Sequence, residues 1–222
     1  PKNKVGLAIF PPLRDAAQIP YEYDCKSSTA PAIASSYYQA GLQYVIVPPG
    51  NGYLQSGSTA LNPTSNLVKA VGGVAGCPSM VAVGGVGTYY ADAIRAAEAA
   101  LPVNENQNVI ILVSDGDASS TKMTALLKPQ QCAQAVTASA SSTAAGTWVY
   151  SLAYGAAISG CSLDTSPKIS PCDAMKAIAS KPSMYFSDST GQCAGTTGNV
   201  VDLFSQVGNS LTIPRLLPRH AL

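Results

Sequence analysis

Apolar residues are arranged along the chain in two kinds of pattern. Uninterrupted apolar runs, typical of strands buried on both faces of a parallel sheet, occur at 5–10, 108–114 and 147–154. Between these runs, apolar residues recur at helical spacing and predict helices over 89–101, 130–145 and 200–211. Because strands and helices alternate, the sequence predicts an α/β fold: a three-layer, doubly wound, mostly parallel sheet with helices on both faces.

Weaker patterns predict the remaining elements. Short strands are expected at 44–47 and 184–187, and short helices at 65–71 and 172–179. Pro11 and Pro12 follow the first apolar run, and we expect the first strand to end there because proline cannot donate to a sheet ladder. The whole chain, 1–222, is predicted to be one domain, with 13–83 as a loop-rich insertion and 212–222 as a tail.

Composition excludes several classes of partner. Charged residues make up 11% of the chain and the formal net charge is +1, so no electrostatic field is expected to recruit nucleic acid or an anionic membrane. No apolar run approaches the roughly 18 residues that a membrane span needs, and the amino terminus is too polar for a signal peptide. Partners are therefore expected to be recognised by local chemistry.

The six cysteines indicate disulfides. Their number is even, they lack Cys-x-x-Cys spacing, and the only histidine, His220, lies in the terminal tail, so a zinc site is disfavoured. Disulfides imply an oxidising compartment, such as the periplasm, the cell surface or the exterior of the cell. Of 15 pairings that six cysteines allow, the turn-rich interval favours Cys161–Cys172, then Cys25–Cys77, which leaves Cys132–Cys193.

Two segments end at the same edge of the predicted sheet. The strand NVIILVS runs into Asp115, and the loop GGVG leads into Thr88 just before the helix at 89–101. Open α/β sheets bind ligands at the carboxyl ends of their strands, so Thr88 and Asp115 are the candidate site residues. Each also has a purely structural interpretation, Thr88 as a helix N-cap and Asp115 as a turn residue before Gly116.

These segments carry a resemblance to a known family. GVGTYYADAIRAAEAAL followed by NVIILVSDGD resembles the third and fourth signature segments of a von Willebrand factor A domain. Three later segments are similar to the carboxyl-terminal region of bacterial Tad pilus-assembly proteins of the TadG type, which carry such a domain. These segments are QCAQAVTASASSTAAGTWVYSLAYG, PCDAMKAIAS and LFSQVGNSLTIPRLLP. The resemblance covers nearly the whole chain.

The resemblance implies a metal-ion-dependent adhesion site. In the family, Mg²⁺ or another divalent cation is held by an Asp-x-Ser-x-Ser loop after the first strand, by a threonine and by a further aspartate. Carried over, the threonine is Thr88 and the aspartate is Asp115. Hydroxyl and carboxylate oxygens are the hard ligands that Mg²⁺ prefers, and few carboxylates leave it able to accept an acidic group from a partner.

The sequence departs from the family at its amino end. No Asp-x-Ser-x-Ser precedes Val5, and the nearest candidate, 24–28 (DCKSS), has lysine in place of the first serine. Taking Asp115, Asp117 and Ser119 as that loop would place the threonine loop upstream of it, contrary to the family order, so this alternative is rejected. The resemblance thus implies an incomplete sheet. Either a further segment, from the same precursor or a neighbouring subunit, supplies the missing strand by β-augmentation, or the sequence is incomplete.

Three functions were weighed. The favoured one is a secreted or surface-associated binding and assembly module, related to pilus assembly, that recognises an acidic group at its metal site. The alternative is a structural subunit of a surface appendage, self-assembling and with a vestigial metal site. No enzyme is expected, and no residue is assigned a catalytic role. A serine hydrolase is disfavoured because no Gly-x-Ser-x-Gly elbow is present and His220 is no plausible base.

Overall fold

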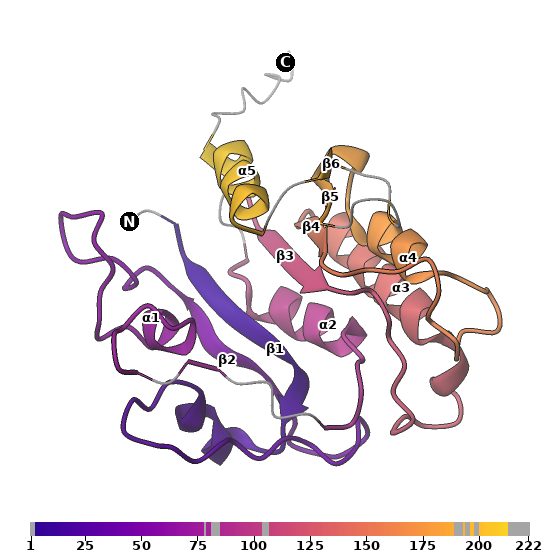
Figure 1. Cartoon of the computed structure of the whole chain (residues 1–222), viewed down its shortest axis with the longest axis horizontal. Coiled ribbons are helices and arrows are strands. Elements are labelled where there is room, and N and C mark those ends of the chain that lie inside the picture. Colours follow the sequence, from indigo (N-terminus) through magenta and orange to yellow (C-terminus); the bar gives the residue numbers. More distant parts are fainter. Residues whose placement is uncertain are drawn as a thin grey trace.

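The chain folds as a mixed α/β protein, as its alternating pattern predicts (Figure 1). The computed structural model describes residues 3–77, 79–80, 85–103, 107–188, 193, 196–197 and 200–212. The strands within these ranges are β1 (Val5–Leu13), β2 (Gln43–Gly50), β3 (Val109–Ser114), β4 (Trp148–Ala153), β5 (Tyr185–Ser187) and β6 (Thr196–Thr197). The α-helices are α1 (Asn66–Ala70), α2 (Ala91–Ala100), α3 (Gln131–Ala144), α4 (Pro171–Ile178) and α5 (Val200–Thr212).

The strands form two sheets rather than one. β1 and β2 make an antiparallel pair, and β3, β4, β5 and β6 make a parallel sheet in that order. In Figure 1 the arrows of β1 and β3 run in the same direction, yet no strand pairing joins them. The single sheet predicted from the sequence is therefore replaced by two separate sheets.

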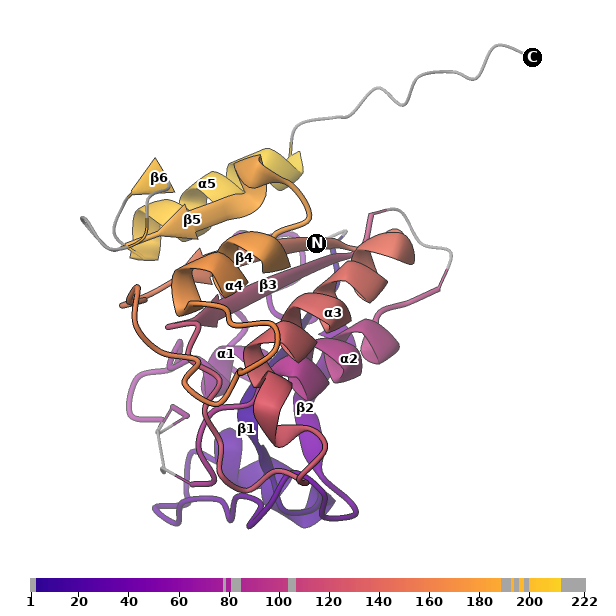
Figure 2. The ribbon, with the colours of Figure 1, turned by 90° about the vertical axis from the view of Figure 1, so that its right-hand side faces the viewer.

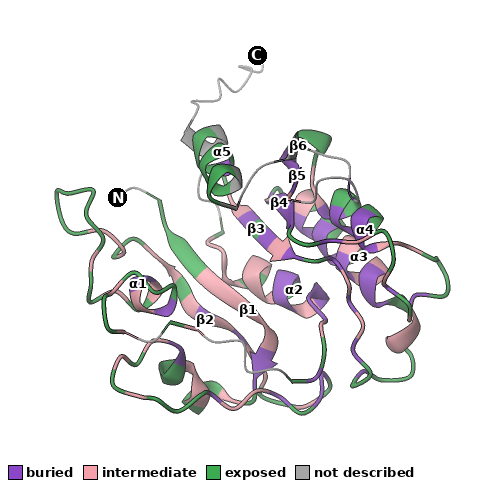
Figure 3. Ribbon diagram, in the orientation of Figure 1, coloured by how far each residue is buried: buried purple, intermediate pink, exposed green. Residues whose placement is uncertain are grey.

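β4 is buried on both faces, as its apolar run predicts, whereas β3 is buried on the face of Ile110 and Leu112 and only partly covered on the face of Ile111. Ile110 and Leu112 of β3 face a large apolar cluster that includes Ile94 of α2, Ala135 of α3 and Met175 of α4. On the other face, Tyr150 and Leu152 of β4 pack with Phe186 of β5 and with Val207 of α5. Figure 2 shows α2, α3 and α4 on one side of β3 and β4, and α5 on the other. The core thus lies against β3 and β4, as the burial colours of Figure 3 show.

Most predicted elements are confirmed, with ends shifted by a few residues. One prediction is wrong: β1 does not end at the prolines but continues through Pro11 and Pro12 to Leu13. β1 is paired only with β2, and its register shifts between Ala8 and Leu13, so the ladder needs no donor at either proline. The 3₁₀ helices Ala16–Glu22, Lys128–Gln130 and Pro182–Met184, and the short strand β6, were not predicted.

All six cysteines form disulfides, but two of the three predicted pairings are wrong. Cys25–Cys77 is as predicted. Cys161 pairs with Cys132 instead of Cys172, and Cys172 pairs with Cys193. The segment before Cys161 folds back over the turn that follows β3, where the Cys161 amide donates to the Asp117 carboxylate at 2.6 Å. The spacing of the cysteines along the sequence does not indicate that these two segments lie together. Three disulfides fit an oxidising compartment, and within the described ranges no helix is long and apolar enough to cross a membrane.

The turn after β3 depends on glycine at position 116. Gly116 has φ +80°, and a Cβ there would meet Cγ of Met175 and the carbonyl oxygen of Pro171, each at 2.7 Å. We predict that Gly116→Ala lowers the free energy of unfolding by about 2–5 kcal/mol, as left-handed strain and overpacking add. Equilibrium urea denaturation measures the loss.

Gly146→Ala is the matched control for this substitution. Gly146 also has a positive φ, +95°, but a Cβ there would meet nothing within 4 Å. Its loss is therefore expected to be the strain alone, about 1–2 kcal/mol. Equal losses for the two variants would show that α4 does not pack closely on the turn.

Candidate functional site

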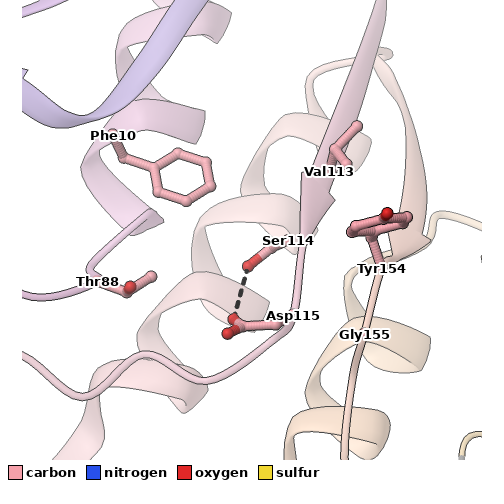
Figure 4. A pocket seen from close by; sticks show the side chains of 7 residues that line it. All are labelled: Phe10, Thr88, Val113, Ser114, Asp115, Tyr154 and Gly155. Carbon is pink, nitrogen blue, oxygen red and sulfur yellow. Dashed lines mark hydrogen bonds between the residues drawn. The ribbon is translucent and has the colours of Figure 1, made fainter. Parts of the chain in front are cut away.

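Thr88 and Asp115, the two residues singled out by the sequence, line one cavity (Figure 4). It has a volume of about 530 Å³ and lies at the carboxyl ends of β3 and β4, beside Phe10 of β1. Its lining residues are Phe10, Thr88, Val113, Ser114, Asp115, Tyr154 and Gly155. A carboxylate, three hydroxyls and two aromatic rings therefore surround the same space.

Thr88 is not the cap of the helix that follows it. α2 begins at Ala91, and its N-cap residue is Tyr90, which makes no side-chain capping hydrogen bond. Thr88 is half-buried, and its side chain forms no hydrogen bond with any other described residue. Its hydroxyl is thus available to a ligand in the cavity, and the capping interpretation raised by the sequence does not apply.

Asp115 has a turn role and a free oxygen. Its Oδ1 accepts from the amide of Asp117 at 3.1 Å and more weakly from the hydroxyl of Ser114 at 3.5 Å. These bonds shape the turn into Gly116, as the turn interpretation predicts. The residue is exposed, and Oδ2 has no partner within the described residues. Half of the carboxylate therefore orders the loop while the other half can meet a ligand.

The loops that carry Thr88 and Asp115 are joined directly. The Ser119 amide donates to the Thr88 carbonyl oxygen at 3.0 Å, and the Ser120 hydroxyl donates to the Val86 carbonyl oxygen. The close approach requires glycine at 87, whose φ is +81° and whose Cβ would lie 3.0 Å from Cα of Ser120. We call this junction of residues 85–90 with 115–120 the loop seam.

A buried glutamine fixes one side of the loop seam. Gln131, at the start of α3, has no exposed surface. Its Oε1 accepts from the Ser120 amide at 2.8 Å, and its Nε2 donates to the Ser120 carbonyl oxygen at 2.7 Å. Both polar groups of one peptide position are thus satisfied by one side chain, which a buried loop needs.

Two buried tyrosines hold the same loops. Tyr90 donates to the Gly116 carbonyl oxygen at 2.9 Å, and Tyr37 donates to the Gly87 carbonyl oxygen at 2.6 Å. Burial raises the pKa of both phenols well above its ordinary range, so both remain donors at neutral pH. Nothing in the sequence separates these two from the other tyrosines among the eleven. No periodicity distinguishes a tyrosine that binds a loop carbonyl from one that only packs.

The donor set of the cavity suits a hard cation in part. Thr88, Ser114 and Asp115 offer only oxygen, the ligand type that Mg²⁺ prefers, but fewer atoms than the six of an octahedral ion. The other acid and thiol group in the described residues, Asp117 with Cys132 and Cys161, is no metal site because the cysteines are joined in a disulfide. His220 lies outside the described residues.

The alternative Asp24–Ser28 segment takes no part in this cavity. Asp24 accepts from the Lys26 amide at 3.0 Å, in a turn next to the Cys25–Cys77 disulfide. Asp117, from the other rejected alternative, accepts from the Cys161 amide and does not line the cavity. Of the acidic residues weighed in the sequence, only Asp115 is brought to Thr88.

The sequence matches no family model and no curated protein. Among solved structures, the chain is similar to the pilus adhesin SpaC from Lactobacillus rhamnosus GG, with a TM-score of 0.47 and 14% identity over 80% of this chain. The chain spans 24% of the length of that adhesin. A likeness of this degree is too weak to assign a function.

The Tyr90 hydroxyl predicts a pH dependence. In the folded protein burial raises its pKa, whereas in the unfolded chain the phenol ionises near about pH 10. The unfolded state therefore binds fewer protons above that pH, and the contribution of Tyr90 to stability is present below about pH 10 and lost as pH rises, at up to about 1.4 kcal/mol per pH unit.

Tyr90→Phe isolates this contribution. Near neutral pH the variant should be less stable by about 1–3 kcal/mol, because the buried Gly116 carbonyl loses its donor. The difference from the wild type should shrink between about pH 9 and pH 11, since only the wild type has this phenol to ionise. Urea denaturation at each pH measures it, and a difference that stays constant would contradict the buried donor.

Proposed function

We propose that this chain is a von Willebrand factor A-like binding module of a pilus-assembly protein, that it acts at the cell surface, and that it recognises an acidic group on a partner. The observation that carries the proposal is the meeting of Thr88 and Asp115 in one cavity, with the Thr88 hydroxyl and one Asp115 oxygen uncommitted. The order of the sequence motifs adds support. No catalytic role is proposed.

The chemistry of the proposed site is cation bridging. Thr88 and Asp115 would hold one side of a Mg²⁺ ion, with Ser114 nearby and water at other positions. Because these residues would supply a single carboxylate, a bound ion would retain enough positive charge to accept a carboxylate from a partner. Phe10 and Tyr154 line the same cavity and would contact the apolar part of that partner side chain.

Asp115→Asn tests the proposed site. The substitution removes the only carboxylate that lines the cavity while keeping its shape and its acceptor for the Asp117 amide. We expect Mg²⁺ affinity, measured by isothermal titration calorimetry on the folded chain, to fall about 10-fold or more, since one charged ligand is lost.

Asp24→Asn is the matched control for this titration. Asp24 is likewise an exposed aspartate that accepts an amide two residues on. We expect its substitution to leave Mg²⁺ affinity unchanged. A wild type that binds no Mg²⁺, or equal affinities for all three proteins, would refute the metal site and favour the structural-subunit alternative.

The open edges of β1 and β3 favour a second function, that of a structural subunit which accepts a strand. In a parallel pair, alternate residues of one strand bond to its neighbour. The carbonyl oxygens of Asn108 and Ser114 accept from Trp148 and Tyr154, so the even-numbered residues of β3 face β4. The amide and carbonyl groups of Val109, Ile111 and Val113 therefore point away from β4, and no described strand pairs with them on that side.

This edge offers both backbone groups and apolar side chains. Ile111 is 37% exposed in the middle of β3, and Val109 and Val113 on the same face are half-buried. An extended apolar segment, from a neighbouring subunit or from elsewhere in the precursor, could pair with β1 and β3 together by β-augmentation. Such pairing would join the two sheets into one.

Hydrogen exchange tests the open edge. In the isolated chain, the amides of Val109, Ile111 and Val113 should exchange at least about 10-fold faster than those of Ile110, Leu112 and Ser114, because only the latter are bonded within the sheet. Residue-resolved exchange by NMR gives both sets from one sample, so the even-numbered amides serve as the internal control. Equal protection would mean that the edge is already satisfied, and the strand-accepting function would fail.

A further inference from the structure

Tyr37 contacts both loops of the candidate site from a distant part of the chain. Its hydroxyl donates to the Gly87 carbonyl oxygen at 2.6 Å and accepts from the Tyr89 amide at 3.1 Å. These two groups flank Thr88 on either side. The hydroxyl therefore satisfies one polar group of the peptide on each side of Thr88, and it fixes the backbone conformation from which Thr88 projects into the cavity.

The backbone of Tyr37 contacts the other loop. Its amide donates to the Lys122 carbonyl oxygen at 3.1 Å, in the segment that follows Asp115 and the loop seam. One residue thus touches the Thr88 loop with its side chain and the Asp115 loop with its main chain. The residue is 7% exposed, and its ring packs edge-on against Tyr89 with the ring centroids 5.2 Å apart, so it has little freedom to move.

The segment around Tyr37 is itself anchored to β1. Ala34 donates its amide to the Pro12 carbonyl oxygen at 3.0 Å, and Ile33 forms a bridge with Leu13. A Cβ at Gly85 would lie 2.1 Å from Cδ1 of Ile33, so this segment also packs directly on the start of the Thr88 loop. The segment that carries Tyr37 therefore connects β1 to both loops.

We propose that Tyr37 is a positioning residue, which sets the separation of Thr88 and Asp115 and thereby the affinity of the cavity for a divalent cation. The inference rests on the proposed function for its ligand but on the hydrogen bonds above for its geometry. Tyr37 itself does not line the cavity. It acts through Gly87, Tyr89 and Lys122.

Tyr37→Phe tests the inference with two readouts. The variant keeps the ring, its contact with Tyr89 and the amide bond to Lys122, and it removes only the hydroxyl. The first readout is native-state hydrogen exchange of two amides. The Tyr89 amide donates to the Tyr37 hydroxyl, and the Ser119 amide donates to the Thr88 carbonyl oxygen across the loop seam. The second is Mg²⁺ affinity by calorimetry. We expect both amides to exchange about 10-fold faster and Mg²⁺ affinity to fall about 10-fold.

Tyr89→Phe is the matched control. It removes a hydroxyl from the other ring of the same aromatic pair, but that hydroxyl donates to Oε1 of Gln134 and touches neither loop carbonyl. Both readouts should stay within about twofold of the wild type. The amides of β4 give an internal reference, because a loss of global stability alone would speed their exchange as much as that of Ser119.

The outcomes separate the inference from the proposed function. Faster exchange of Ser119 in Tyr37→Phe alone, with weaker Mg²⁺ binding, supports both. The same exchange result with a wild type that binds no Mg²⁺ refutes the cation site and leaves Tyr37 setting only the separation of the loops, which overturns the affinity part of the inference. Ser119 exchange that changes equally in both variants, or only in step with β4, overturns the inference outright.

Discussion

The candidate site depends on one physical constraint. Two loops that are far apart in the sequence must satisfy the hydrogen-bonding groups of each other's backbone. At the loop seam the Thr88 carbonyl accepts from Ser119, and Ser120 is held through both its amide and its carbonyl by buried Gln131. An unpaired amide or carbonyl in this place would cost about 1–3 kcal/mol. The arrangement of Thr88 and Asp115 around the cavity is thus set by main-chain and turn hydrogen bonds, which leave the Thr88 hydroxyl and Oδ2 of Asp115 uncommitted within the described residues.

The β3 turn shows how packing and site geometry are coupled. Gly116 is pressed between Tyr90, which donates to its carbonyl, and the start of α4, which leaves no room for a Cβ. The Cys132–Cys161 disulfide lies beside the same turn, where the Cys132 sulfur contacts the Ala118 amide at 3.3 Å. Asp115 therefore stands on a loop that is fixed from three directions, which reduces the ordering cost of binding a ligand there.

The sequence predicted what periodicity and local chemistry determine. Continuous apolar runs located β3 and β4, helical spacing located α2 and α3, and the carboxyl-edge rule brought Thr88 and Asp115 together. What it missed depends on contacts between distant segments. The disulfide partners of Cys161 and Cys172 follow from how loops cross, and the roles of Tyr37 and Gln131 follow from which carbonyl each meets. Periodicity along the sequence does not show which distant segments come into contact.

The Cys25–Cys77 disulfide has a mechanical consequence. Tension applied to the two ends of the chain would pass through the sulfur–sulfur bond and bypass residues 26–76, because that bond joins the ends of this loop covalently. Tyr37 lies inside the bypassed loop, whereas Thr88 and Asp115 lie on the stretch between Cys77 and Cys132 that would carry the load. Under pulling, the covalent path would therefore run through the segment that carries Thr88 and Asp115 and not through Tyr37.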